Sequence, residues 1–207
     1  MNDLLLGTTN AGKQREFGRL LAEIPGRLVF PQQVGIDLDV PEPHGTYAEN
    51  AAAKADAYCR ASGLLTLADD SGIEVAALDW GPGVTTARFG GPEVTDRVGL
   101  LLEAVGDSPD RAARMVCFLV LAIPDAAGGP PQFETFSGII QGSLATERRG
   151  TGGFGYDPVF LLPSGQTTAE LPDGEKDHIS HRGLAVQAAM PRLRDLLANA
   201  PAAAIER

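Results

Sequence analysis

The chain opens with the sequence LLLGTTNAGK at residues 4–13. The three leucines predict a short buried strand, and the polar residues 8–10 that follow them predict a turn. Over residues 11–24, apolar side chains recur with the period of a helix, and Pro25-Gly26 ends that helix. A strand, a turn and a helix in succession are typical of the α/β fold class.

The rest of the chain continues this alternation of strands and helices. The best-marked helix spans residues 47–62, because Thr46 and Glu49 have the spacing of a capping box and Gly63 stands where a left-handed C-terminal cap is expected. Pro191 is expected to kink or split the last helix. The other expected elements are one or two strands within 27–40, a strand over 64–67, a helix over 92–105, strands over 115–123 and 133–144 that form an antiparallel hairpin, a short strand over 159–162, and helical sequence from residue 180 onward.

Length and charge limit the classes of function. A chain of 207 residues makes one domain or two close lobes. Its 17 Lys and Arg residues stand against 27 Asp and Glu residues, a formal net charge of −10. This acidic balance argues against a protein that grips long nucleic acid through a basic face. A small anionic ligand is still compatible with it, because a few local cations can outweigh the net charge.

Cysteine usage and the N-terminus indicate the cellular location. Cys59 and Cys117 lie far apart and lack metal-ligand spacing, so we expect reduced, buried thiols. The apolar run at residues 4–6 is far shorter than a signal peptide or a membrane span. We therefore expect a cytoplasmic protein without a membrane partner.

Residues 7–14, GTTNAGKQ, are the first candidate binding segment. They match the phosphate-binding pattern G-x-x-x-x-G-K, but Gln14 stands where a P-loop has the Ser or Thr that binds magnesium. Lys13 falls in the first helical turn, where a cation is unfavourable by about 0.3–1 kcal/mol unless an anion lies nearby. Free backbone N–H groups at the helix start would cradle phosphate oxygens. An ordinary capped helix with a surface lysine is the alternative.

Acidic residues mark a second candidate site. Asp69 and Asp70 come after an apolar strand, at what we expect to be its exit. Adjacent carboxylates there are costly to leave unpaired, and they are the oxygen ligands that Mg²⁺ prefers. Glu42, in a loop with a proline on each side, is a candidate to complete this site. A carboxylate that the metal does not fully use can orient or deprotonate water, whereas a turn cap is the alternative role for either aspartate alone.

Three further features are candidates for binding. Lys54 shares a helix face with Asn50 and can reach a phosphate near the strand ends. Ser180 is a predicted cap that precedes His181 and Arg182, so cationic side chains again stand at a helix start, where they can bind an anion or donate to the carbonyl oxygens of a base. A solvated lysine and an arginine paired with a surface carboxylate are the alternatives. The loop at 150–157 has four glycines within six residues, which packing alone does not explain.

Five sequence blocks in one order resemble a single family, that of the noncanonical purine NTP pyrophosphatases, the inosine triphosphate pyrophosphatase-like enzymes. The blocks are TTNAGK at 8–13, YAENA at 47–51 followed by Lys54, ADDSG at 68–72, GGFGYDP at 152–158 and SHRG at 180–183. They spread over nearly the whole chain. The resemblance implies one catalytic domain, residues 1–207, built on an elongated mixed β-sheet flanked by helices, with two lobes and the active-site cleft between them.

The resemblance also implies a function. The family hydrolyses dITP, ITP and XTP to the monophosphate and pyrophosphate with Mg²⁺, as a homodimer that cleanses the nucleotide pool. By this resemblance Asp70 would be a metal ligand and the catalytic proton acceptor, and Glu42 a second metal ligand. The implied substrate-binding residues are Thr8, Thr9, Asn10, Ala11, Gly12, Lys13 and Lys54 around the phosphates, Ser71 beside Asp70 on the substrate, and Phe154, Gly155, Tyr156, Asp157, Lys176, His181 and Arg182 around the purine. Thr9 departs from the family, where glycine often stands at this position.

The chemistry of the base agrees with this resemblance. To discriminate a 6-oxo purine from adenine, a site needs donors aimed at the oxygen, and a buried donor left facing an amino group costs about 1–3 kcal/mol. His181 and Arg182 are suitable donors, and Phe154 offers a face on which a base can stack.

Two other classes of function compete with the pyrophosphatase. Residues 7–13, with residues 64–69 as a Walker-B-like strand, suggest a P-loop NTPase or kinase, and Gln14 is the feature against it. A catalytically silent nucleotide sensor would bind ITP without turnover, and the presence of both Asp69 and Asp70 argues against it.

Overall fold

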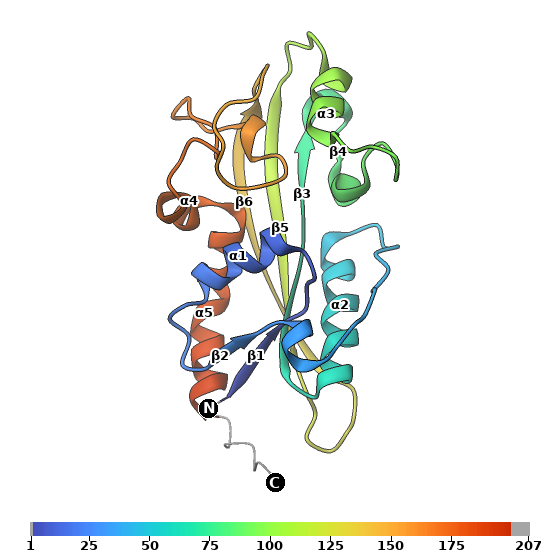
Figure 1. Ribbon diagram of the computed structural model, residues 1–207, viewed down its shortest axis with the longest axis vertical. Coiled ribbons are helices and arrows are strands. Elements are labelled where there is room, and N and C mark those ends of the chain that lie inside the picture. Colours follow the sequence, from blue (N-terminus) through green and yellow to red (C-terminus); the bar gives the residue numbers. More distant parts are fainter. Residues whose placement is uncertain (1, 200–207) are drawn as a thin grey trace. The chain divides into compact units, whose positions relative to one another are not determined.

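The computed structural model describes residues 2–199 and confirms a mixed α/β architecture (Figure 1). Seven strands form one sheet in the order β2-β1-β3-β5-β6-β7, with β4 paired to β3. The strands are β1 (Asp3–Leu6), β2 (Arg27–Val29), β3 (Leu65–Val75), β4 (Gly81–Pro82), β5 (Ala112–Ile123), β6 (Gln132–Leu144) and β7 (Phe160–Leu161). The helices are α1 (Ala11–Leu20), α2 (Tyr47–Ser62), α3 (Arg97–Val105), α4 (Asp173–Ile179) and α5 (His181–Asn199). No helix in this described part of the chain is long and apolar enough to cross a membrane.

The chain divides into two compact units. Unit 1 holds the described residues up to Asp70, residues 118–137 and the described residues from Ala185 onward, whereas unit 2 holds residues 71–117 and 138–184. The long strands β3, β5 and β6 and the helix α5 each contribute residues to both units.

In unit 1 the parallel strands β2, β1 and β3 carry the helices. The register pairs Leu4 of β1 with Leu28 of β2 and with Leu65 of β3. Helix α2 packs its small residues onto the sheet, so that its backbone approaches β3 and β5 closely (Figure 1). The buried contact consists of Ala51, Ala55 and Cys59 of α2 with Ala68, Val120 and Ala122 of the sheet.

Unit 2 has its own apolar core, which carries the antiparallel part of the sheet. Here Glu74 of β3 pairs with Pro82 of β4, and Leu144 of β6 pairs with Phe160 of β7. The buried members of this core are Ile73, Val75, Leu101, Val105, Ala113, Met115, Ile140, Leu144, Tyr156, Val159 and Phe160.

The strongest sequence signals are confirmed. Helix α2 begins and ends where its caps predict, because Thr46 accepts a hydrogen bond from the Glu49 N–H and Gly63 adopts φ 67°. In a capping box the Glu49 side chain is expected to accept from the Thr46 backbone N–H. Here the Glu49 carboxylate accepts from the Thr46 hydroxyl instead, at 2.8 Å. The hairpin of β5 and β6 is present, and both cysteines are buried free thiols.

Three element boundaries were wrong, and the segment 27–40 holds the smaller of the two expected numbers of strands. Strand β3 does not end near residue 67 but runs to Val75, so Asp69 and Asp70 lie inside a strand. The segment 27–40 holds only the short β2 and a 3-10 turn at Pro31–Val34, because irregular backbone with inward-facing Ile36 and Leu38 can also alternate in polarity. Helix α3 begins at Arg97, where Asp96 caps it, instead of at residue 92. The first helix stops at Leu20.

Pro191 was expected to kink or split the last helix, and the splitting was wrong. Helix α5 continues through Pro191 as one element from His181 to Asn199. A proline removes a single backbone donor, and the buried Ala189 and Leu193 on either side anchor the helix by packing. The short helix α4, which the sequence analysis did not predict, precedes it.

Candidate active site

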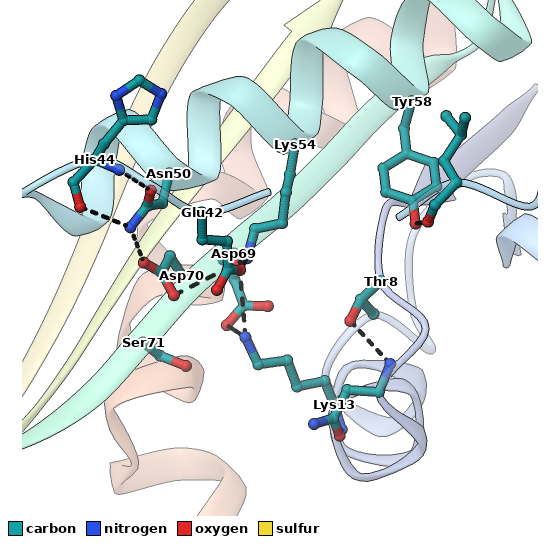
Figure 2. A network of polar contacts seen from close by, with 12 residues as sticks. Thr8, Lys13, Glu42, His44, Asn50, Lys54, Tyr58, Asp69, Asp70 and Ser71 are labelled. Carbon is teal, nitrogen blue, oxygen red and sulfur yellow. Dashed lines mark hydrogen bonds and ion pairs between the residues drawn. The ribbon is translucent and has the colours of Figure 1, made fainter. Parts of the chain in front are cut away.

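The two adjacent aspartates of β3 are buried and contact different partners. Asp69 is 1% exposed and Asp70 is 5% exposed. Successive side chains of a strand point to opposite faces, so the two carboxylates are directed to different helices. Lys13 Nζ of α1 lies 2.9 Å from Asp69 Oδ2, whereas Asp70 contacts residues of α2 (Figure 2). Cationic or amide groups therefore stabilise both buried charges.

The loop between β1 and α1 is held by its own polar side chains. Asn10 caps the helix by accepting from the Lys13 N–H at 3.1 Å, and the Thr8 hydroxyl accepts from the Asn10 N–H at 3.2 Å. Gln14 donates from Nε2 to the Thr8 carbonyl oxygen at 2.9 Å. The anion that compensates Lys13 within this structure is Asp69, which meets the charge requirement inferred from the sequence.

Lys54 is the cation that faces Asp70 from α2. Its ammonium forms an ion pair with Glu42 and lies 3.9 Å from Asp70 Oδ1. Burial opposes the charge on the ammonium, but the carboxylates of Asp69, Asp70 and Glu42 together outweigh this effect and raise the pKa of Lys54. Lys54 therefore carries its positive charge at neutral pH.

The Asp70 carboxyl has the opposite balance of forces. Burial raises the pKa of Asp70, and the neighbouring Glu42 carboxylate adds to that effect. Lys54, Lys13 and a hydrogen bond from Asn50 act in the other direction without cancelling it. A carboxylate with a raised pKa is a better proton acceptor than an ordinary aspartate, which suits a general base.

Asp70 and Glu42 fit the requirements of a Mg²⁺ ion that is also bound by phosphate. Mg²⁺ commonly uses one or two protein carboxylates and completes its octahedron with water and substrate phosphate oxygens. The two carboxylates approach the same ammonium, that of Lys54. Among residues 2–199 there is no group of three His, Cys, Asp or Glu side chains placed to hold a metal by themselves. The donor set therefore suits a metal bound together with its substrate.

In unit 2, the start of α5 brings three predicted residues into a buried setting. Ser180 caps the helix by accepting from the Gly183 N–H at 3.0 Å. His181 and Arg182 are 4% and 7% exposed. Arg182 donates from Nη2 to the Ser71 hydroxyl at 2.8 Å, so the residue that directly follows Asp70 in the chain contacts the predicted base-binding arginine.

The glycine-rich loop positions Phe154 beside two cations. The Arg182 guanidinium lies 4.8 Å and the Lys176 ammonium 5.7 Å from the centre of the Phe154 ring. Asp157 accepts from the Phe154 N–H at 2.7 Å and from the Thr168 hydroxyl at 2.8 Å. These bonds hold the backbone of Phe154, and so the root of its side chain, in place.

Tyr156 has a different environment from its neighbours in this loop. Its hydroxyl donates to the Thr86 carbonyl oxygen at 3.1 Å, and its ring belongs to the apolar core of unit 2. Burial raises the pKa of Tyr156 to about 12. The side chain thus anchors the loop internally.

The predicted site residues form two groups, one in each unit. The group in unit 1 consists of Thr8, Thr9, Asn10, Ala11, Gly12, Lys13, Glu42, Lys54 and Asp70, and the group in unit 2 consists of Ser71, Phe154, Gly155, Tyr156, Asp157, Lys176, His181 and Arg182. Sequence reasoning missed the contact of Asn50 with Asp70 and that of Thr168 with Asp157. The sequence did offer a signal for Asn50, because this residue lies one helical turn before Lys54. No such signal marks Thr168.

Comparisons with known proteins agree over most of the chain. Residues 4–192 match the family model described as the Ham1 family. The chain is 45% identical to a dITP/XTP pyrophosphatase of Chromobacterium violaceum over 201 residues, covering 94% of this chain and 98% of the relative. It is 42% identical over 200 residues to a dITP/XTP pyrophosphatase of Shigella flexneri, covering 94% of this chain and the whole of that protein.

Solved structures show the same fold. The Ham1 protein of Staphylococcus aureus superposes with a TM-score of 0.80 at 32% identity, covering 94% of this chain and 99% of that one. A HAM1 protein of Coxiella burnetii superposes with a TM-score of 0.79 at 36% identity, covering 97% of this chain and all of that one.

Proposed function

Since this chain belongs to the Ham1 family, we propose that it is a nucleoside triphosphate pyrophosphatase that hydrolyses dITP, ITP and XTP to the monophosphate and pyrophosphate. The observation that carries this proposal is the likeness, over 94% of the chain, to a dITP/XTP pyrophosphatase. The enzyme would remove deaminated purine nucleotides from the nucleotide pool. Its two groups of site residues support this reaction in different ways.

The group in unit 1 has the chemistry for the triphosphate. The buried Lys54 and the partly buried Lys13 are both paired with carboxylates, and phosphate oxygens would offer them alternative anionic partners. The N–H groups at the start of α1, with Thr8, Thr9 and Asn10 beside them, would donate to the same oxygens. Ala11 and Gly12 lack bulky side chains; Ala11 is exposed and would leave room for a phosphate, whereas Gly12 is buried.

The proposed reacting groups are Asp70 and the water that it deprotonates. Water attacks the triphosphate, the anhydride bond between the α and β phosphates breaks, and pyrophosphate leaves. Asp70 and Glu42 would hold Mg²⁺, which when bound neutralises negative charge on the phosphate oxygens. The raised pKa of Asp70, caused first by burial, supports its role as the proton acceptor.

The group in unit 2 has the chemistry for a 6-oxo purine. His181 and Arg182 are donors for a carbonyl oxygen, and Phe154 offers an aromatic face for stacking. Gly155 leaves open space where a Cβ would stand, so the backbone at that position is accessible to a base. Asp157 and Lys176 would act by holding Phe154 in place, Tyr156 by anchoring the loop, and Ser71 by orienting Arg182.

A P-loop NTPase is a weaker candidate. Gln14 supplies no hydroxyl for a magnesium ion and instead binds the Thr8 carbonyl oxygen. The lysine of the pattern, Lys13, pairs with Asp69. The contacts of Gln14 and Lys13 therefore differ from those in a P-loop, where a hydroxyl binds magnesium and the lysine binds phosphate.

The experiment that tests the proposal is product analysis with ITP, XTP, dITP, ATP and GTP, with and without Mg²⁺. Pyrophosphate formed from the first three nucleotides only in the presence of Mg²⁺ is the expected result. Orthophosphate from ATP would favour the P-loop NTPase, and binding of ITP without any turnover would favour a sensor.

A single catalytic domain of two lobes and a homodimer remain predictions from the family resemblance, and a cytoplasmic location remains a prediction from the cysteines and the N-terminal sequence. Light scattering of the purified protein, coupled to size exclusion, distinguishes a dimer from a monomer of 21.7 kDa.

A further inference from the structure

The fully buried side chain of Asn50 joins the proposed catalytic carboxylate to the loop that carries Glu42. Asn50 has no exposed surface. Its Nδ2 donates to Asp70 Oδ2 at 3.0 Å and to the His44 carbonyl oxygen at 3.3 Å, and its Oδ1 accepts from the His44 N–H at 3.0 Å (Figure 2). One amide thus contacts β3 and the loop that precedes α2.

These contacts determine the orientation of the amide. Two acceptor oxygens face Nδ2 and one N–H donor faces Oδ1. A flipped amide would place oxygen against both acceptors and NH₂ against the donor, and all three hydrogen bonds would be lost. A buried polar group without a hydrogen-bond partner is costly, so the observed orientation is strongly preferred.

The contact with His44 also restrains Glu42. Both backbone groups of His44 bind Asn50, and Glu42 lies two residues before His44 in the sequence Pro41-Glu42-Pro43-His44. Proline fixes its own φ and restricts the residue before it, so this stretch has little freedom once His44 is held. Lys54, one helical turn after Asn50, pairs with Glu42 itself.

We propose that Asn50 is a positioning residue for the hydrolysis. Its amide sets the orientation of the Asp70 carboxylate and, through His44, the place of Glu42. Asn50 contacts no reacting atom in this scheme and acts through Asp70. The inference rests on the proposed function, because it assigns Asn50 to the carboxylate that receives the proton.

Tyr58 provides the matched control. It lies two turns after Asn50 on the same face of α2, and its hydroxyl donates to the Leu38 carbonyl oxygen at 3.1 Å, in the segment that leads to Glu42. Tyr58→Phe removes one hydrogen bond between α2 and that segment and leaves the bond between Asn50 and Asp70 intact. A general loosening of the segment would therefore affect both variants, whereas positioning of Asp70 would affect only the Asn50 variants.

The test compares steady-state kinetics with ITP and thermal unfolding for Asn50→Ala, Asn50→Asp and Tyr58→Phe. We expect Asn50→Ala to lower kcat by about 10- to 100-fold, because a misplaced catalytic group costs up to about 10²-fold in rate. Its KM should stay within about twofold of the wild-type value. Asn50→Asp nearly preserves shape but places a carboxylate against Asp70, so it should lower kcat at least as much. Tyr58→Phe should keep kcat within about twofold.

A double-variant cycle separates positioning from a general structural effect. If Asn50 acts through Asp70, Asn50→Ala should lower the residual rate of the Asp70→Asn enzyme by less than about twofold. A loss of the full size in that background would overturn the inference.

Other outcomes are equally decisive. Wild-type enzyme that releases pyrophosphate from ITP, together with Asn50→Ala and Asn50→Asp enzymes of unchanged kcat, would refute the role of Asn50 and leave the proposed function intact. Failure of both Asn50 variants to unfold cooperatively, with Tyr58→Phe well folded, would show a purely structural role and also refute it. A wild-type enzyme without ITP turnover would refute the proposed function itself.

Discussion

The Lys176 ammonium lies 2.6 Å from Asp157 Oδ2, and the two side chains are only 2% and 3% exposed. The same carboxylate oxygen accepts from the Phe154 N–H at 2.7 Å. A buried ion pair therefore fixes the backbone of the aromatic residue that we assign to the base. Such a pair contributes little net stability by itself, but the loss of one partner leaves an uncompensated buried charge.

Lys176→Met should consequently destabilise the protein by about 3–5 kcal/mol. The methionine keeps the apolar part of the side chain, so the missing ammonium beside Asp157 is the main change. Urea unfolding measures the difference in free energy. The double variant Lys176→Met/Asp157→Asn removes both charges and should recover part of the loss; a double variant less stable than the single one would contradict this explanation.

Gly153 is required beside this ion pair. Its φ is +68°, and a Cβ at this position would lie 2.1 Å from Asp157 Oδ2 and 2.9 Å from Lys176 Nζ. Gly153→Ala should destabilise the protein by about 3 kcal/mol, through the clash and the left-handed backbone together. Thermal and urea unfolding check the effect.

Gly165→Ala is the control for that substitution. Gly165 has φ +84°, and a Cβ there would meet nothing within 4 Å. Only the backbone cost of about 1–2 kcal/mol should appear. Equal destabilisation by the two variants would show that contact with the ion pair is unimportant.

Arg182→Ala should weaken the preference for ITP over ATP. Arg182 is a buried donor beside Phe154, and a donor aimed at a carbonyl oxygen discriminates by about 1–3 kcal/mol, or roughly 5- to 150-fold. The ratio of kcat/KM values for the two nucleotides measures the preference. Full discrimination by the Arg182→Ala enzyme would exclude this residue from the base site.

Asp70→Asn should lower ITP turnover by about 10²- to 10⁴-fold, the range for a lost general base, and leave measurable ITP binding. Initial rates and calorimetric titration measure the two properties. Asp56→Asn is a suitable control because Asp56 lies on the same helix as Lys54 and pairs with the exposed Arg60. Normal turnover by Asp70→Asn would remove Asp70 from the chemistry.

Gln14→Ser tests whether the segment at 7–14 behaves as a P-loop. We expect no gain of orthophosphate release from ATP. The loss of the bond from Gln14 to the Thr8 carbonyl oxygen should raise KM for ITP by about 2- to 10-fold, since a typical hydrogen bond contributes about 0.5–1.5 kcal/mol. Magnesium-dependent ATP hydrolysis by this variant would instead support the P-loop interpretation.

Local signals predicted the elements that depend on local interactions. The helix at 47–62 follows from a cap residue, an alanine-rich body and a C-terminal glycine, all within one short segment. The apolar residues of β5 also mark a buried strand without any knowledge of its partners. In contrast, the extent of β3 depends on pairing: its polar residues Asp69 and Asp70 continue the strand because groups from α1 and α2 stabilise them.

The sequence by itself determined the α/β class and the presence of cationic side chains at the N-termini of two helices. It also determined the five sequence blocks that resemble those of nucleotide pyrophosphatases. Only the tertiary structure decided which partner each cation meets: Asp69 for Lys13, Glu42 for Lys54, and the Ser71 hydroxyl for Arg182. Caps and periodicity act within a few residues, so they can be read along the chain. The partner of each of these cations lies 12 to 111 residues away in the sequence, and only tertiary packing brings it within hydrogen-bond distance.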